Sequence, residues 1–132
     1  GHTIVAREVV GDDTHDIANI ISSWSKSAEV EAIVVTGGTG ASVRDVTVET
    51  ITSMFAAILP GFGELFRQLS YKEIGAGAML SRAEAGWTDV GSLRTPVFML
   101  PGSPQAVQLA MRELITPQLG HLLAVCRQRN TI

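Results

Sequence analysis

The spacing of hydrophobic positions divides the first half of the chain into alternating strands and helices. Thr3–Val10 is rich in β-branched residues and alternates loosely, which predicts a strand that ends at Gly11. Ala32–Val35 is a short apolar run typical of a buried strand, and residues 49–57 predict a helix that follows an N-cap at Thr47. The helix between the two strands, ending near Lys26, is predicted from apolar residues that recur at helical spacing: Ile17, Ile20, Ile21 and Trp24.

The middle of the chain contains a predicted break and a short helix. Pro60-Gly61-Phe62-Gly63 combines the residues that most often interrupt regular structure. Residues 64–69 then predict a short helix, whose side chains expected to face inward are Leu65, Phe66 and Leu69.

The second half predicts a β-hairpin followed by helix. Ala85–Val90 and Thr95–Leu100 are expected to pair as antiparallel strands through a turn at Gly91-Ser92. Ser103-Pro104 is a typical helix start, because serine caps the first free N–H groups and proline fits the first helical position. Pro117 is expected to kink or split the helical region that follows.

This order of elements predicts one α/β domain. Strands that alternate with helices of this length favour a mostly parallel sheet covered by helices on both faces. A chain of 132 residues has the length of one ordinary domain and is long enough to bury a core.

Composition and charge narrow the classes of function. With 45% hydrophobic and 17% charged residues the chain reads as globular, and it has no apolar run long enough to suggest a membrane partner. A net charge of −3 without a Lys/Arg stripe argues against nucleic-acid binding. The single cysteine, Cys126, excludes an intrachain disulfide, and the scattered histidines do not resemble a zinc site, so a cytoplasmic location is expected.

A glycine-rich loop follows the strand predicted at 32–35. Glycines permit the left-handed turns that align successive N–H groups into a concavity for anions, so this loop is a candidate phosphate site. Asp45, a few residues later, is a candidate Mg²⁺ ligand beside those phosphates. The loop is neither a Walker A motif nor G-x-G-x-x-G, and a plain strand-to-helix connection remains the alternative. Its residues are Thr36, Gly37, Gly38, Thr39 and Gly40.

Three loops follow predicted strands, and in open α/β sheets ligands bind at the carboxyl ends of the strands. We therefore expect residues 11–13, 36–45 and 101–104 to converge on one site. Asp13 is placed equally well to cap the following helix, whereas a cap does not require Asp12, which makes Asp12 the stronger candidate. Ser103 is expected to cap its helix and is also suited to contact phosphate.

The ordered motifs of the chain resemble the molybdenum-cofactor biosynthesis family of MoaB and MogA. The likeness covers nearly the whole chain, because T-G-G-T-G, R-D-V-T and P-G-S-P occur in this order and at these separations. The motifs that carry it are Asp12-Asp13, Thr36–Gly40, Arg44–Thr47 with Glu49, Pro60–Gly63, Leu80–Arg82 and Pro101–Pro104.

The resemblance implies a three-layer α/β/α sandwich that assembles as a trimer or as a dimer of trimers. It also implies the reaction: molybdopterin and ATP, with Mg²⁺, give adenylylated molybdopterin and pyrophosphate, which makes the chain a nucleotidyltransferase. An oligomeric pterin- or nucleotide-binding homologue without activity is the alternative, and a CinA-like nucleotide hydrolase is disfavoured by the Arg44-Asp45 pair.

Site residues follow from the resemblance by motif. Asp12 and Asp45 match the two acidic positions needed for catalysis or Mg²⁺ binding, and the glycine loop would hold phosphate. Ser81 matches a serine near the bound pterin. The turn that would help to hold molybdopterin or nucleotide comprises Pro101, Gly102 and Ser103.

One departure from the family concerns the start of the chain. The family begins with a further strand, a loop and a helix ahead of the position that matches Gly1. Residues 1–132 are therefore expected to form a single molybdopterin-binding domain that lacks this first strand and helix.

Overall fold

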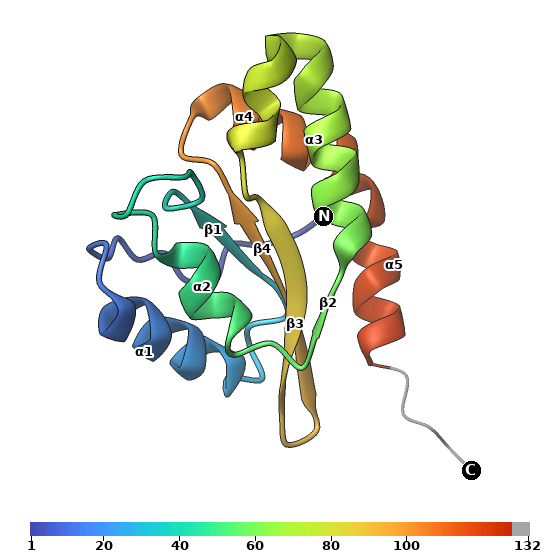
Figure 1. The fold of residues 1–132 in the computed structure, drawn as a ribbon. Helices are drawn as coiled ribbons and strands as arrows, with labels where there is room; N and C mark the ends of the chain where they lie inside the picture. Colours follow the sequence, from blue (N-terminus) through green and yellow to red (C-terminus); the bar gives the residue numbers. More distant parts are fainter. Residues whose placement is uncertain (128–132) are drawn as a thin grey trace.

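The structure, a computed structural model, describes residues 1–127 and consists of a small sheet between two helical layers. Helices α1 and α2 lie on one side of the sheet and α3, α4 and α5 on the other (Figure 1). In chain order the elements are α1 (Thr14–Ser25), β1 (Ile33–Thr36), α2 (Thr47–Thr52), β2 (Ala57–Ile58), α3 (Pro60–Ile74), η1 (Gly75–Leu80), β3 (Glu84–Val90), β4 (Leu93–Leu100), α4 (Pro104–Ala110), η2 (Met111–Ile115) and α5 (Thr116–Cys126).

The sheet has the strand order β1-β4-β3-β2. β1 and β4 are parallel, with Thr36 opposite Leu100, whereas β3 is antiparallel to both of its neighbours. The expected α/β sandwich is confirmed, but the sheet in residues 1–127 is mixed, because the β3–β4 hairpin and the short β2 supply antiparallel pairs. The parallel pair brings the carboxyl ends of β1 and β4 side by side.

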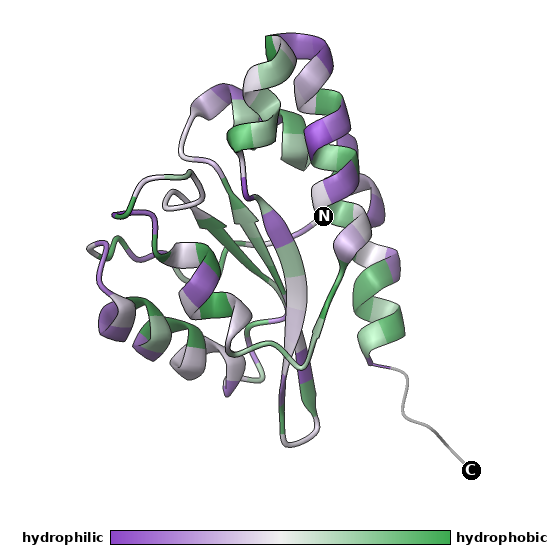
Figure 2. Ribbon diagram, in the orientation of Figure 1, coloured by the Kyte–Doolittle hydropathy of each residue, from purple (hydrophilic) through white to green (hydrophobic). Residues whose placement is uncertain are grey.

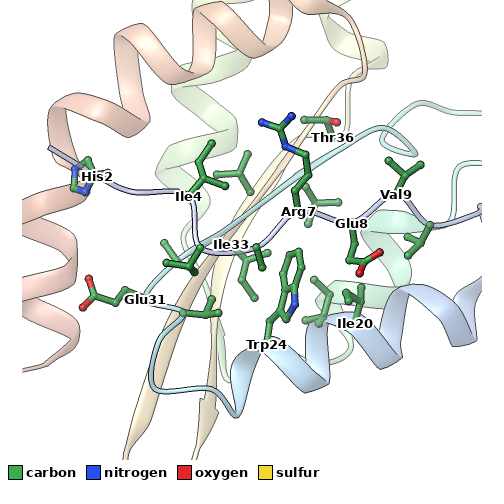
Figure 3. Close-up of a pocket in the computed structure, with 18 of the residues that line it drawn as sticks. His2, Ile4, Arg7, Glu8, Val9, Ile20, Trp24, Glu31, Ile33 and Thr36 are labelled. Carbon is green, nitrogen blue, oxygen red and sulfur yellow. The ribbon is translucent and has the colours of Figure 1, made fainter.

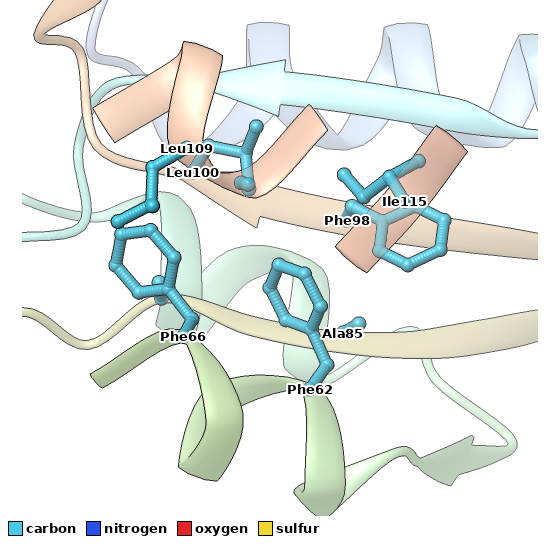
Figure 4. Close-up of a cluster of buried hydrophobic side chains, with 9 residues drawn as sticks. Phe62, Phe66, Ala85, Phe98, Leu100, Leu109 and Ile115 are labelled. Carbon is cyan, nitrogen blue, oxygen red and sulfur yellow. The ribbon is translucent and has the colours of Figure 1, made fainter. Parts of the chain in front are cut away.

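β4 is the central strand of the core, because its side chains alternate between the two helical layers. Phe98 and Leu100 belong to the cluster under α3 and α4, whereas Val97 and Met99 belong to the cluster under α1 and α2. Figure 4 shows Phe62 and Phe66 of α3 beside Phe98, Leu100 and Leu109. The Phe62 and Phe98 rings meet edge to face with centroids 5.3 Å apart, which is a favourable aromatic geometry.

Hydrophobic periodicity explains how the helices cover the sheet. In α1 the side chains of Ile17 and Ile21 are buried and Trp24 packs beside them, as the spacing predicts. Figure 2 shows hydrophilic and hydrophobic positions alternating along α1 and α3. In α3 Phe66 is buried, but Leu65 is half exposed, so the expectation that Leu65 faces inward was wrong.

The expected strand at Thr3–Val10 does not form. Within residues 1–127, β1 pairs only with β4, and residues 1–12 are exposed and outside the sheet. The edge of β1 that faces this segment is separated from it by a cavity lined by both. β-Branched composition favours an extended conformation, but a strand forms only when a partner backbone is within hydrogen-bond distance.

Two predictions around α2 and α3 were wrong in their boundaries. α2 ends at Thr52, and Ala57–Ile58 forms β2 beside β3, because the chain turns back to pair with Trp87 and Gly86. α3 begins at Pro60, where the sequence suggested a break, since proline is well suited to the first turn of a helix. Thr47 is a buried first residue of α2, not its N-cap, which is Val46.

The second half of the chain follows the sequence closely. β3 and β4 form the expected hairpin, and Ser103 caps α4 by accepting a hydrogen bond from Ala106 N at 3.2 Å. The helical region beyond α4 widens into the π-helical η2 just before Pro117, near the start of α5. A proline disrupts the normal i−4 bond of a helix, and a π turn is one of the ways in which a helix accommodates that disruption.

Candidate functional site

The glycine loop leaves β1 through two left-handed residues. Gly37 and Gly38 have φ values of 97° and 70°, a region that side-chain-bearing residues rarely adopt. Gly37 N donates to Leu100 O at 2.8 Å, which continues the β1–β4 pairing for one residue. The sequence-based expectation of left-handed turns in this loop is therefore confirmed.

The loop exposes backbone donors at its centre. Within residues 1–127, the N–H groups of Gly38, Thr39 and Gly40 donate to no protein acceptor. Thr39 is buried, while the two glycines are partly accessible. Free N–H groups that follow left-handed glycines are the main-chain chemistry of an anion-binding loop.

Asp45 closes the loop through its own carboxylate. Its Oδ2 accepts a hydrogen bond from Ser42 N at 2.9 Å, and a Cβ built on Gly40 would lie 2.9 Å from the same oxygen. Gly40 therefore leaves room for the Asp45 carboxylate. Asp45 also lines a shallow hollow with Ser42, Glu49 and Thr50.

The two aspartates of the first loop have different roles. Asp13 is the N-cap of α1, since its Oδ1 accepts from Asp16 N at 3.0 Å. Asp12 is exposed and takes no part in the cap. Of the two alternatives for Asp13, the structure supports the cap, and Asp12 is left as the acidic group available for chemistry.

A cavity of about 990 Å³ lies between the N-terminal segment, β1, α1 and α5. Figure 3 shows Trp24, Ile20 and Ile33 along it, with Arg7 and Thr36 nearby. Most of its lining is apolar, and Asp12, Thr36 and Gly37 are among the residues that line it. Asp12 and the start of the glycine loop therefore border the same cavity.

The turn after β4 meets the glycine loop. A Cβ built on Gly102 would lie 3.7 Å from Gly37 Cα, an ordinary packing distance. The contact follows from the parallel pairing of β1 and β4, which ends at Thr36 and Leu100. Pro101, Gly102 and Ser103 therefore border the candidate phosphate loop, as the sequence predicted, although the Ser103 hydroxyl is already used as the α4 cap.

The segment before β3 supplies a residue that the sequence analysis left without a role. Ser81 is half-buried, and its hydroxyl accepts from Ala83 N at 3.3 Å. The neighbouring Arg82 bonds the glycine loop directly: its backbone N–H donates to Thr39 O at 2.8 Å and its Nε to Gly40 O at 2.7 Å. The Leu80-Ser81-Arg82 motif indicated the place, but no spacing in the sequence indicates this contact.

Two of the predicted site residues are not brought into one hollow. Asp12 lines the large cavity, whereas Asp45 lines the shallow hollow on the other side of the loop. In the part of the chain that the structure describes, no three His, Cys, Asp or Glu side chains gather closely enough to hold a metal ion by themselves.

The electrostatics of the site centre on Glu49 in α2. The hydrogen bond from the Arg82 guanidinium holds the pKa of the Glu49 carboxyl below its usual range. Away from the site, burial raises the pKa of the Cys126 thiol, so this cysteine has little thiolate character.

None of the helices in residues 1–127 is both long and apolar enough to cross a membrane.

Comparisons with known proteins identify the family of the chain. A family described as "Probable molybdopterin binding domain" matches residues 1–121. The molybdenum cofactor biosynthesis protein B of Bacillus subtilis (strain 168) is 44% identical over 129 residues, which are 97% of this chain and 74% of that protein.

Solved structures show the same fold. A crystal structure of molybdenum cofactor biosynthesis protein B matches with a TM-score of 0.87 and 40% identity, over 95% of this chain and 76% of that one. The tungsten cofactor synthesizing protein MoaB from Pyrococcus furiosus matches with a TM-score of 0.84 and 37% identity, over 92% and 74% of the two chains. The chain therefore belongs to the molybdenum cofactor biosynthesis family of molybdopterin-binding domains, among the relatives of MoaB.

Proposed function

We propose that the chain transfers AMP from ATP to molybdopterin, giving adenylylated molybdopterin and pyrophosphate. The observation that carries the proposal is the meeting of the glycine loop with the Gly102 turn at the carboxyl ends of β1 and β4. This edge is where open α/β sheets bind ligands. Family membership supplies the substrate class, and the free backbone donors supply a place for phosphate.

Backbone donors suit the proposed reaction because phosphoryl-type transfer depends mainly on positioning and charge stabilisation. The N–H groups of Gly38, Thr39 and Gly40 would hold the triphosphate of ATP. Ser81, Pro101, Gly102 and Ser103 border the loop on two sides and would hold the pterin.

The residues present fit Mg²⁺. One oxygen of Asp45 is used by Ser42 N, but within residues 1–127 its Oδ1 has no hydrogen-bond donor. Mg²⁺ usually takes only one or two protein carboxylates and completes its shell with substrate phosphates and water, so a sparse acidic set is sufficient. Asp45 would hold the ion, whereas Asp12 lines a different hollow and is not brought to the same ion in this structure. When bound, Mg²⁺ neutralises charge on the departing pyrophosphate.

The reaction needs no protein nucleophile. A terminal phosphate oxygen of molybdopterin attacks the α-phosphorus of ATP and forms the new O–P bond. The bond from the α-phosphorus to the bridging oxygen breaks, and its electron pair leaves with pyrophosphate. The attacking oxygen is already ionised, so no proton has to be removed by a side chain.

A non-catalytic pterin- or nucleotide-binding homologue is the second candidate. It is favoured by the engagement of Asp45 Oδ2 with its own loop and by the location of Asp12 and Asp45 in different hollows.

We also propose that the chain assembles as the trimer or dimer of trimers that the family implies. Exposed apolar side chains at Ile74, Met79 and Leu80 support this assembly, and light scattering in solution tests it.

The decisive experiment incubates the protein with molybdopterin, ATP and Mg²⁺ and measures adenylylated pterin by chromatography. We expect product with the wild type and little with Asp45→Asn, whose amide oxygen can still accept the Ser42 N–H. Asp13→Asn is the matched control, because asparagine caps a helix as well as aspartate does. Binding of both substrates without product would favour the non-catalytic homologue.

A further inference from the structure

Arg82 is the main connection between the glycine loop and the rest of the fold. It bonds the loop through its backbone N–H to Thr39 O at 2.8 Å, through Nε to Gly40 O at 2.7 Å and through Nη2 to Asp45 O at 2.9 Å. Its Nη1 pairs with the Glu49 carboxylate in α2. One residue therefore holds three carbonyls of the loop and the first turn of the following helix.

The two ends of the loop are tied to the fold, because Gly37 N donates to Leu100 O and Thr47 N donates to Gly38 O, but the bonds of its outer turn are internal. Ser42 N donates to Asp45 Oδ2, Asp45 N donates to Ser42 O and Arg44 N donates to Ser42 Oγ. These bonds shape the turn at residues 42–45 but do not fix its position relative to the sheet. The bonds from Arg82, which lies two residues before β3, fix the position of this turn relative to the sheet.

The bonds from Arg82 also set the direction of the free donors. In a trans peptide the C=O and the next N–H point in opposite directions. When Thr39 O and Gly40 O point at Arg82, the N–H groups of Gly40 and Ala41 point away from it. The third bond, to Asp45 O, fixes the backbone from which the Asp45 carboxylate projects.

All three nitrogens of the Arg82 guanidinium are engaged in these contacts, through three of its five N–H groups. Nε, Nη1 and Nη2 each donate to a protein oxygen, and Glu49 supplies the countercharge. An arginine beside a phosphate loop commonly contacts the phosphate itself. Here the guanidinium is directed at two loop carbonyls and Glu49, so turning its fork toward a phosphate would break bonds that hold the loop.

We propose that Arg82 is a positioning residue, which orients the backbone donors of Gly40 and Ala41 and the Asp45 carboxylate without contacting substrate. The kinetic part of this inference rests on the proposed adenylyl transfer, whereas its structural part does not. Lysine cannot replace Arg82, because a single ammonium lacks the planar fork that reaches Gly40 O, Asp45 O and Glu49 together.

The test compares Arg82→Lys with Arg67→Lys in the full chain. Arg67 is the matched control, because its Nη1 donates to Ala83 O at 2.7 Å next to Arg82 without touching the loop. We expect the backbone order parameters of residues 39–45 to fall from about 0.85 to below about 0.6 in Arg82→Lys only. In the adenylylation assay, kcat should fall at least roughly tenfold, while KM for ATP changes by less than about threefold.

Two results would overturn the inference. The first is a rigid loop in Arg82→Lys with a tenfold higher KM for ATP, which would make Arg82 a phosphate ligand. The second is equal loosening of the loop by both variants. If the wild type makes no adenylylated pterin, the proposed function fails while the order parameters still decide the role of Arg82.

Glu49→Gln is a second variant, which tests the inference even if Arg82→Lys fails to fold. This variant keeps the three carbonyl bonds of Arg82 and removes only the charge of its partner. We expect loop order parameters and kcat close to those of the wild type. A loop as loose as in Arg82→Lys would show that the ion pair, and not the carbonyl bonds, holds the loop, and would overturn the inference.

Discussion

Gly38 packs its Cα directly against the side chain of Thr47, so that a Cβ built on Gly38 would lie 2.0 Å from Thr47 Oγ1. Thr47 is buried at the start of α2, and its N–H donates to Gly38 O at 3.3 Å. The close approach holds the glycine loop against the helix that follows it. Any side chain at Gly38 would push the two apart.

We therefore predict that Gly38→Ala destabilises the protein more than Gly37→Ala does. A residue with a side chain in the left-handed region costs about 1–2 kcal/mol, which applies at both positions. Only Gly38 adds a clash, since nothing lies within 4 Å of a Cβ at Gly37. Urea unfolding of the two variants measures the difference.

A double-mutant cycle with Thr47→Ala tests the cause. Removing Oγ1 relieves the clash, so Thr47→Ala should be less damaging in the Gly38→Ala background than in the wild type. We expect a coupling free energy of at least about 0.5 kcal/mol, which is the usual limit for residues in contact. Additive effects would mean that the loop moves away from Thr47 freely.

The next prediction separates the two neighbouring aspartates. Asp13→Ala should lower the free energy of unfolding by about 1 kcal/mol, the usual effect of losing an N-cap, and leave the activity of the folded protein intact. Asp12→Asn should change stability by less than about 0.5 kcal/mol, because the side chain is exposed and has no cap role. Its adenylylation rate should fall by roughly 100-fold, the order of effect of one electrostatic group.

Thermal unfolding and the adenylylation assay on both variants check this. The opposite pattern, with activity lost in Asp13→Ala and retained in Asp12→Asn, would show that Asp13, and not Asp12, takes part in the chemistry. Asp13→Asn should behave like the wild type in both measurements.

The fold was predictable where local chemistry decides it. Ser103-Pro104 is a capped helix start in the sequence and in the structure, and the β3–β4 hairpin follows from two β-rich runs around Gly91. Thr3–Val10 was not predictable in this way. Its residues have high β-propensity, but pairing depends on whether another backbone lies alongside, which no local pattern reports.

The site was predictable where backbone conformation is encoded by glycine. Gly37 and Gly38 have the left-handed φ values that the T-G-G-T-G sequence indicates. The role of Arg82 was not predictable, because it joins residues about 40 positions apart through main-chain oxygens that every residue type carries. A residue that accepts a hydrogen bond through its backbone carbonyl can be of any type, so such a contact leaves no pattern in the sequence.

The ion pair between Arg82 and Glu49 predicts a dependence of stability on pH. The pKa of Glu49 is lower in the folded protein, so ionised Glu49 stabilises the fold above the usual glutamate pKa of about 4.3. This contribution is lost as the pH falls through the lowered folded-state value. Both side chains are partly exposed, so it should be at most about 1 kcal/mol.

Thermal unfolding of the wild type and Glu49→Gln between pH 7 and pH 3 measures this contribution. The wild type should be more stable by a constant amount above about pH 5, and the difference should shrink toward pH 3. High salt should reduce it at every pH, because exposed charges are screened. Glu64→Gln, at an exposed position of α3, is the control and should show no such dependence; a difference that grows toward acid pH would contradict the sign of the pKa shift.

The last prediction uses two glycines in opposite surroundings. A Cβ on Gly86 in β3 would lie 2.5 Å from Ala57 O and 2.4 Å from the Phe55 ring, so Gly86→Ala must displace β2 from the sheet edge. We expect it to lower the free energy of unfolding by about 1–3 kcal/mol, as overpacking does. Gly120 lies inside α5 with nothing within 4 Å of its Cβ position. Gly120→Ala should therefore raise the free energy of unfolding by about 0.5–1 kcal/mol, because alanine loses less backbone entropy than glycine when a helix forms. Urea midpoints at constant m-value measure both changes. Equal stability of Gly86→Ala and the wild type would mean that β2 does not pack against β3 as the structure shows.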